Sequence, residues 1–311
     1  MSAETQGTPR RVPYDEFSMF HENASEFGLE WNGPPIVRRV QAPTADGRNL
    51  SALVWGEGEP EFVFLHGGAQ NAHTWDTVLL ALGRPAVAID LPGHGHSDSG
   101  RAGSLGLDDN ADDVAGAITA LAPAARAVVG MSLGGLTSLA VAGRHPDLVR
   151  ALVLVDITPG FNRERSRAIT DFVNGPETFP DFDAILERTI QFNPTRTESS
   201  LRRGILHNAQ QLEDGSWVWR HARFRQADRE APPVDMAERA GRLWDVVSGL
   251  PAPVMLVRGM RPQSVVGDED EAELRRRRPD ARVEHVEEAG HSVQGDDPLA
   301  LARLIDDFVS R

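Results

Sequence analysis

The sequence contains no cysteine and no lysine in its 311 residues. Without cysteine the protein has no disulfide, no thiol nucleophile and no thiolate metal site. All 32 basic residues are therefore arginine, which excludes Schiff-base chemistry, pyridoxal phosphate held on a lysine and the lysine-containing phosphate loop of nucleotide-binding proteins. We expect no cofactor.

Long apolar runs are also missing, and none approaches the length of a membrane span. The segment Met1–Pro13 is polar and lacks the apolar centre of a secretory signal. The net charge of -14 argues against a nucleic-acid partner, because phosphate binding needs a basic surface. We expect a cytoplasmic protein, monomeric or homodimeric, that acts on a small molecule.

Short apolar segments alternate with helical patterns along most of the chain. Eight segments are predicted to be strands: Ile36–Val40, Leu50–Trp55, Glu61–Leu65, Ala86–Asp90, Ala127–Gly130, Ala151–Val155, Pro253–Val257 and Arg282–Val286. Helices are predicted at Ala72–Leu82, Asp108–Leu121, Leu133–Arg144, Asp268–Arg278 and Leu299–Val309. This alternation favours an α/β fold, with a mostly parallel eight-stranded sheet and helices on both faces.

Two stretches depart from the alternation. Residues 1–35 form a polar N-terminal extension with scattered aromatic residues, and residues 158–250 are irregular and rich in arginine. We therefore expect a core of residues 36–157 and 251–311. The segment 158–250 is predicted to be an inserted helical cap, which covers the carboxyl ends of the strands as a lid.

The most informative motif is the G-x-S-x-G pattern around Ser132. Gly130 and Gly134 flank the serine, an apolar strand precedes it, and a helix of small residues follows it. This context is that of a nucleophile elbow, a sharp turn that exposes the serine hydroxyl. The glycines have a physical reason, because side chains at these positions would collide with the neighbouring strand and helix. The alternative is a Gly/Ser loop in which Ser132 caps the helix.

Polar residues follow several of the predicted strands. His66, Asp90, Ser132 and Asp156 come after strands three to six, and His291 comes after the eighth. Ligands of such sheets bind at the carboxyl ends of the strands. A serine, a histidine and a carboxylate at this edge indicate nucleophilic acyl transfer.

The chain resembles the α/β-hydrolase superfamily over nearly all of residues 36–310. The motifs that carry the resemblance are Leu65-His66-Gly67-Gly68, Asp90-Leu91-Pro92-Gly93-His94-Gly95-His96-Ser97, Gly130-Met131-Ser132-Leu133-Gly134-Gly135 and Ala289-Gly290-His291. The resemblance implies that Ser132 is the nucleophile and His291 the general base. It also implies an oxyanion hole made by the backbone N–H groups of Gly68 and Leu133.

The third member of the triad departs from the usual family pattern. Members of the family usually place an acid after the seventh strand, where this chain has Gln263. A smaller set takes the acid from the end of the sixth strand, which is the position of Asp156, 24 residues after Ser132. We therefore predict Asp156 as the acid. Asp268 or Asp270 would take this role only if their loop folded back toward His291.

The insertion is expected to determine which substrate the protein binds. Aromatic residues there supply the lid's own small core, and one or two of them are expected to line a pocket over Ser132. The predicted pocket residues are His66, Gly67, Met131, Phe161, Trp217 and Trp219. Arg163, Arg165 and Arg167 are candidates for binding a substrate carboxylate, although exposed arginines without such a role are the default.

Together these features predict a serine hydrolase that cleaves a small, fairly hydrophobic carboxylic ester through an acyl-enzyme. Thioesters, lactones, amides and C–C bonds next to a carbonyl stay open as alternatives, and so does a non-catalytic ligand-binding homologue. A remote alternative is a zinc hydrolase, because His94, His96 and Asp98 match the first five places of an H-x-H-x-D-H signature whose sixth place is Ser99 here. We expect no metal.

Overall fold

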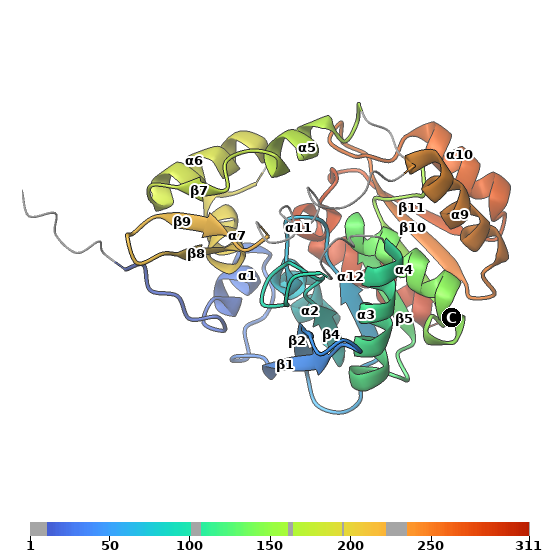
Figure 1. The fold of residues 1–311 in the computed structure, drawn as a ribbon, viewed down its shortest axis with the longest axis horizontal. Coiled ribbons are helices and arrows are strands. Elements are labelled where there is room, and N and C mark those ends of the chain that lie inside the picture. The colour runs from blue at the N-terminus through green and yellow to red at the C-terminus, as the bar shows by residue number, and fades with distance from the viewer. Residues whose placement is uncertain (1–10, 101–106, 161–163, 195, 222–234, 311) are drawn as a thin grey trace, which may run out of the picture.

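The computed structural model describes residues 11–100, 107–160, 164–194, 196–221 and 235–310. Figure 1 shows their arrangement. The strands are β1 (Val37–Pro43), β2 (Asn49–Trp55), β3 (Phe62–Leu65), β4 (Ala86–Ile89), β5 (Ala127–Met131), β6 (Leu152–Val155), β7 (Thr178–Phe179), β8 (Ala209–Gln211), β9 (Trp217–Trp219), β10 (Val254–Gly259) and β11 (Arg282–Val286). The α-helices are α1 (Phe20–Glu26), α2 (Asp76–Leu82), α3 (Leu107–Leu121), α4 (Leu133–Arg144), α5 (Arg167–Val173), α6 (Phe182–Phe192), α7 (Glu198–Asn208), α9 (Met236–Gly249), α10 (Asp268–Arg277), α11 (Val293–Asp296) and α12 (Pro298–Val309).

Eight strands form one sheet in the order β1-β2-β4-β3-β5-β6-β10-β11. The pairs β1/β2 and β2/β4 are antiparallel, and the other five pairs are parallel. The predicted α/β class and its mostly parallel sheet are therefore confirmed. Between β3 and β5 the strand order reverses direction, because β4 lies on one side of β3 and β5 on the other. Such a switch point leaves a crevice at the carboxyl ends of the two strands, where ligands bind in open α/β sheets.

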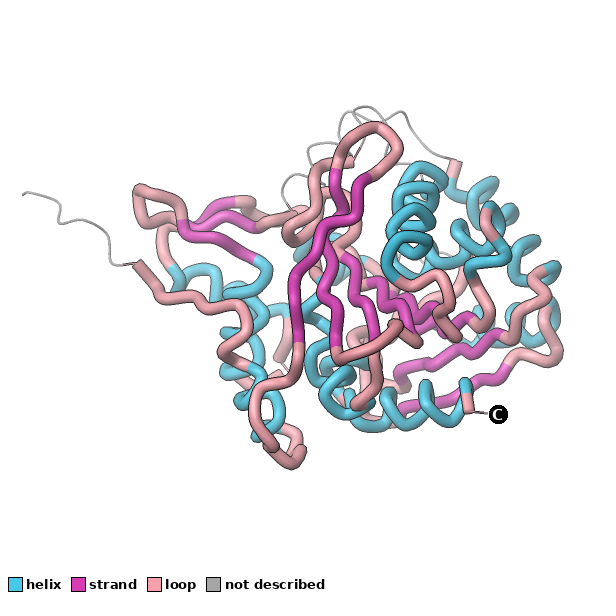
Figure 2. Tube along the Cα trace, turned by 90° about the horizontal axis from the view of Figure 1, so that it is seen from below, coloured by secondary structure: helices cyan, strands magenta, loops and turns pink. Residues whose placement is uncertain are grey.

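Alternating side chains of the strands fill two apolar cores, one on each face of the sheet. In β5, Val128 packs in the core that contains α3 and α4, while Val129 packs in the core that contains α2 and α12. This follows from the two-residue period of a strand. Figure 2 shows the strands from below, with helices beside them. Because both faces are covered, the central strands are apolar throughout, as buried parallel strands are.

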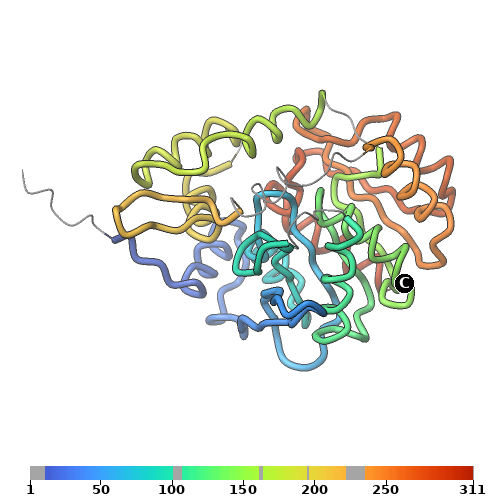
Figure 3. Tube along the Cα trace, in the orientation of Figure 1, coloured from blue at the N-terminus to red at the C-terminus, as the bar shows by residue number. Residues whose placement is uncertain are grey.

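The N-terminal residues join the core to the insertion. Phe20 of α1 is buried in the core with its ring against Trp55, whereas Met19 packs among apolar residues of the insertion. Glu22 and Glu26 of α1 form ion pairs with Arg202 and Arg203 of α7. Figure 3 shows the N-terminal segment running beside the strands of the insertion. The expected N-terminal extension is thus bound to both parts of the molecule.

The insertion after β6 is expected to be helical, and the structure adds a small sheet to its helices α5, α6 and α7. Strands β7, β9 and β8 pair antiparallel in that order. Trp217 and Trp219 of β9 pack with Phe179 and Ile185 to form a separate apolar core. A Trp-Val-Trp sequence gives this alternation, because every second residue of a strand points to the same face.

Helix α9 belongs to the predicted insertion by sequence but packs on the main core. Leu243, Trp244 and Val247 are buried with residues of α3 and α4. A side chain at Gly143 of α4 would meet Val246 at 2.7 Å, so the two helices approach closely. We propose that the lid comprises α5 to β9, and that α9 is part of the core. No helix within the described ranges is long and apolar enough to cross a membrane.

Candidate active site

Ser132 lies in a strained turn between β5 and α4. Its backbone angles are φ 50° and ψ -117°, in a region that side chains rarely adopt. The two flanking glycines make this turn possible. A Cβ at Gly130 would lie 2.5 Å from the carbonyl oxygen of Gly134, and a Cβ at Gly134 would lie 2.2 Å from that of Leu65. The strand, turn and helix therefore hold the serine at the carboxyl end of β5, where strain of this kind is typical of functional sites.

Asp156 directly follows β6 and is completely buried. Its Oδ1 accepts hydrogen bonds from the Gly259 N–H at 3.1 Å and the Ser264 hydroxyl at 2.6 Å. Its Oδ2 accepts from the Val265 N–H at 3.0 Å and from His291 Nδ1 at 2.9 Å. Four donors thus compensate for the loss of water around a buried carboxylate. They also fix both of its oxygens in place.

The hydrogen bond to Asp156 sets the tautomer of His291. A carboxylate only accepts, so Nδ1 of His291 carries the proton and Nε2 is left with a lone pair. Ser132 and His291 line the same cavity, whose volume is about 440 Å³. The structure therefore brings Ser132 and His291 to one cavity and joins Asp156 to His291 by a hydrogen bond.

The loop after β10 supplies two hydrogen-bond donors to Asp156, which the sequence did not reveal, but it does not supply the acid. Gln263, at the usual family position of the acid, lies beside Gly290 on the cavity wall. Asp268 instead pairs with Arg258 at 2.7 Å, and its side chain is 94% exposed. Asp270 accepts a hydrogen bond from the Gly267 N–H at the start of α10. Neither aspartate folds back toward His291.

Two backbone N–H groups belong to segments next to Ser132, the loop after β3 and the first turn of α4. The loop after β3 passes so close that a Cβ at Gly67 would lie 3.3 Å from the Cβ of Ser132, and Gly68 continues this loop along the cavity. Leu133 begins α4, where the first N–H groups have no partner within the helix. Within the described part of the chain, the N–H groups of Gly68 and Leu133 donate no hydrogen bond. Both are available to a ligand.

The cavity is lined by some of the predicted pocket residues and by others that sequence reasoning missed. Gly67 and Met131 lie on its wall as expected. The apolar part of the wall comes mainly from the lid, through Ile169, Phe172, Val173 and Phe192. These residues follow the apolar pattern of α5 and α6, and nothing in that pattern distinguishes a pocket face from a packing face.

Among the described residues, three predicted pocket residues do not line this cavity. His66 is fully buried; its Nδ1 donates to the Gly67 carbonyl and its Nε2 accepts from the Leu91 N–H, so it joins two loops. Trp217 packs against Phe182 in the lid core, because its side of β9 faces that core. Trp219 lines a second, smaller cavity. Phe161 lies outside the described residues.

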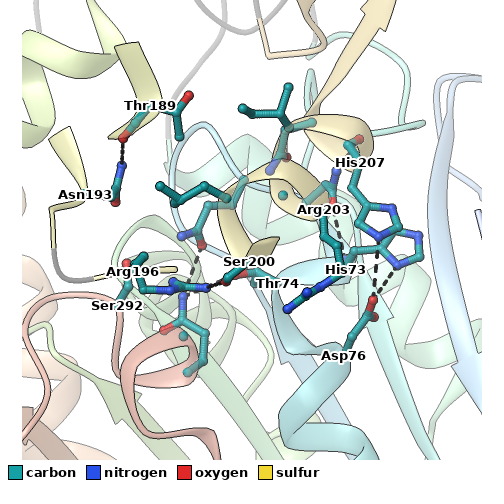
Figure 4. Close-up of a pocket in the computed structure, with 18 of the residues that line it drawn as sticks. His73, Thr74, Asp76, Thr189, Asn193, Arg196, Ser200, Arg203, His207 and Ser292 are labelled. Atoms are coloured by element: carbon teal, nitrogen blue, oxygen red, sulfur yellow. Dashed lines mark hydrogen bonds and ion pairs between the residues drawn. The ribbon is translucent and has the colours of Figure 1, made fainter. Parts of the chain in front are cut away.

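The second cavity has a volume of about 180 Å³ and adjoins a buried cluster of titratable groups (Figure 4). His73 contacts Asp76 through Nδ1 at 2.9 Å and Glu16 through Nε2 at 3.0 Å. Burial acts to lower the pKa of His73, but the two carboxylates outweigh it and raise this pKa to about 9. His207 stacks on His73, with ring centroids 3.7 Å apart. His73, Asp76 and His207 are close enough together to hold a metal ion, but the His73 nitrogens already engage the two carboxylates.

Of the histidines of the possible zinc signature, His94 has partners on both ring nitrogens. Nδ1 of His94 donates to the Pro92 carbonyl, and its Nε2 accepts from the Ala69 N–H. Burial is the largest of the effects that lower the pKa of His96, to about 4. Asp98 accepts a hydrogen bond from a backbone N–H of β2. These contacts are those of a structural loop.

Of the two described cap arginines that the sequence singled out, one lines the cavity and the other is exposed at the surface. Arg165 lines the cavity of Ser132, whereas the Arg167 side chain is 82% exposed. Arg163 lies outside the described residues. Arg196, which the sequence did not single out, lines both cavities.

The chain is similar to a known protein family, to two named relatives and to a solved structure. A family model described as the alpha/beta hydrolase fold matches residues 60–298. The esterase Rv0045c of Mycobacterium tuberculosis is 46% identical over 299 residues, which cover 94% of each chain. A crystal structure of that esterase aligns with a TM-score of 0.80, 44% identity, and coverage of 97% of this chain and all of the other. The 2-(acetamidomethylene)succinate hydrolase of Mesorhizobium japonicum is 30% identical over 281 residues, which cover 88% of this chain and 95% of that protein.

Proposed function

Because this chain belongs to the family of the alpha/beta hydrolase fold, we propose that it is a carboxylic ester hydrolase that uses Ser132 as nucleophile, His291 as general base and Asp156 as the acid of the triad. A relative that shares 46% of its residues over nearly its whole length is an esterase. The observation that carries the residue assignment is the hydrogen bond from His291 Nδ1 to the buried Asp156, at the cavity that also contains Ser132.

The reaction begins when the hydroxyl oxygen of Ser132 attacks the ester carbonyl. His291 Nε2 takes the hydroxyl proton, and the negative charge of Asp156 stabilises the imidazolium that forms. The carbonyl oxygen becomes negatively charged and accepts hydrogen bonds from the N–H groups of Gly68 and Leu133. A donor of this kind contributes about 3–4 kcal/mol in comparable hydrolases.

The imidazolium then gives its proton to the leaving alkoxide, and the alcohol departs. This leaves the acyl group on Ser132 as an ester. Water, activated by the same His291 nitrogen, attacks the acyl-enzyme and releases the acid. No step requires a metal or an organic cofactor, because the serine, the imidazole and the two N–H groups supply the nucleophile, the proton transfers and the charge stabilisation.

The cavity supports a small, partly apolar acyl group as the substrate. Its volume of about 440 Å³ is at the small end of ligand sites. The apolar wall supplied by α5 and α6 suits a short hydrocarbon chain. One relative acts on 2-(acetamidomethylene)succinate, so the family also contains hydrolases of small acids.

Labelling with a fluorophosphonate and turnover of 4-nitrophenyl butyrate test this proposal. The parent protein is expected to take up one phosphonyl group on Ser132 and to release 4-nitrophenol. Ser132→Ala is expected to lose the label and to lower kcat by about 10³-fold or more. Ser248→Ala is the matched control, because this serine lies on α9 and its hydroxyl bonds only the Trp244 carbonyl. Undiminished labelling or turnover in Ser132→Ala would overturn the assignment.

A further inference from the structure

Arg196 lies in the turn between α6 and α7, on the wall that the two cavities share. Figure 4 shows its side chain beside Ser200 and Ser292, apart from the His73 cluster. The same cavity that contains Ser132 and His291 is therefore open to a guanidinium group from the lid.

The guanidinium of Arg196 has few partners of its own. Within the described ranges, its one side-chain hydrogen bond runs to the hydroxyl of Ser200. Among the described residues, no carboxylate lies within ion-pair distance of it, although two other poorly exposed arginines have two carboxylates each. Arg39 pairs with Glu16 and Asp90, and Arg258 pairs with Asp268 and Glu271. A partly buried cation without a counter-charge is costly, so this guanidinium is suited to an anionic ligand.

The charged groups around Arg196 leave its other donors unused. Asp296 and Glu26 attract it from beyond ion-pair distance, and Arg203 repels it. Glu26 already pairs with Arg203, and Asp296 accepts the N–H of Gly290. Burial is the largest influence on Arg196 and lowers its pKa.

Gly295 of α11 leaves room for the guanidinium. A Cβ at Gly295 would lie only 2.0 Å from Nη1 of Arg196. The absence of a side chain there allows the arginine of the lid to reach the helix that follows His291. The cation is thus held on the wall of the cavity, next to the helix that follows His291.

We propose that Arg196 binds a carboxylate at the far end of the substrate's acyl chain, so that the preferred substrates are half-esters of short dicarboxylic acids. This inference rests on the function proposed above. The ester carbonyl lies at Ser132, the methylene groups lie along Ile169, Phe172 and Phe192, and the planar guanidinium meets the carboxylate with paired hydrogen bonds. The net charge of -14 repels anions in general, so a preference for an anionic ester requires a local cation.

The test compares monomethyl adipate with its neutral analogue, in which a primary amide replaces the free carboxylate. Methanol release is measured at neutral pH for the parent, Arg196→Gln and Arg202→Gln. The last variant removes an equal charge from an exposed ion pair on α7 and is the matched control. Tm is measured for each variant.

The parent is expected to show a higher kcat/KM for the carboxylate ester than for the amide. Arg196→Gln is expected to lower kcat/KM for the carboxylate ester by about 10- to 100-fold, because charge-assisted hydrogen bonds are lost. The amide is expected to change by less than about threefold, and Arg202→Gln is expected to keep the parent's preference.

Several results would overturn the inference. If the parent hydrolyses the amide analogue with the same kcat/KM as the carboxylate ester, it has no site for the anion. A preference that survives in Arg196→Gln, or that disappears only in Arg165→Gln, assigns the anion elsewhere. If Arg196→Gln does not fold, competitive inhibition of the parent by adipate decides instead, and inhibition no stronger than that by adipamide refutes the site. If neither ester shows turnover that depends on Ser132, the proposed function itself fails.

Discussion

Replacing Asp156 with asparagine removes the charge of the predicted acid while keeping its shape. The carboxylate accepts four hydrogen bonds in the structure, two on each oxygen. An asparagine has only one oxygen, and its NH₂ group must take the place of the other. In either orientation the NH₂ group faces a backbone N–H, that of Gly259 or that of Val265, which leaves a buried donor without an acceptor. The variant is therefore expected to lose about 1–3 kcal/mol of folding free energy.

The effect on catalysis comes through the tautomer of His291. When the NH₂ group faces Nδ1, that nitrogen must accept a hydrogen bond, so the imidazole proton moves to Nε2. A protonated Nε2 no longer accepts the proton of Ser132. The same change in a serine protease triad lowers kcat by about 10⁴-fold, and we expect a loss of about 10³- to 10⁴-fold here. This corresponds to about 4–5.5 kcal/mol of transition-state stabilisation.

The assay measures kcat and KM for 4-nitrophenyl butyrate, together with thermal unfolding followed by circular dichroism. Asp268→Asn is the matched control, because its carboxylate is exposed and pairs with Arg258. That variant is expected to stay within about threefold of the parent. A folded Asp156→Asn protein with kcat within about tenfold of the parent would refute Asp156 as the acid. A large loss in Asp268→Asn would point to the loop after β10 instead.

Three further perturbations test other parts of the molecule. Gly134→Ala is expected to abolish activity and lower Tm, since its Cβ would lie 2.2 Å from the Leu65 carbonyl oxygen; a parent-like Tm would show that the elbow tolerates a side chain. The pKa of His73 is raised from its ordinary 6.5 to about 9, so its protonation stabilises the fold fully below 6.5, and this stabilisation is lost as pH rises through about 9. The free energy of unfolding in urea should therefore fall more steeply between neutral and alkaline pH in the parent than in His73→Gln, and equal slopes would contradict this account. Exhaustive dialysis against a chelator is expected to leave ester turnover unchanged; a loss that added zinc reverses would favour a metal site, with His94 and His96 as the first candidates.

The local geometry of the nucleophile was readable from the sequence because a tight turn is a short-range structure. The conformation of Ser132 depends on which atoms its near neighbours carry, and Gly130 and Gly134 stand within two residues of it. The alternation of strands and helices is equally local, since each element's apolar period reflects its own burial. The predicted helix at residues 133–144 therefore matches α4.

The partners of Asp156 were not readable in this way. Ser264 and Val265 are more than a hundred residues away in the chain, and they reach the carboxylate only because β10 pairs with β6. The sequence offered Asp156 as the acid by resemblance. Its hydrogen bond to His291, which follows β11, requires the pairing of β11 with β10 as well. Such contacts depend on the register of the sheet, which no single segment encodes.

The sequence by itself determined the class of fold, the position of the serine elbow and the residue types available for chemistry. Tertiary structure alone decided which aromatic residues line the cavity, since Trp217 is buried in the lid core whereas Phe172, at the edge of that core, lines the cavity. It also decided that Arg196, rather than a neighbouring arginine on α7, faces the cavity with no carboxylate partner in the described part of the chain. The reason is physical: burial and charge pairing are properties of surfaces that meet in space, and the chain brings those surfaces together only on folding.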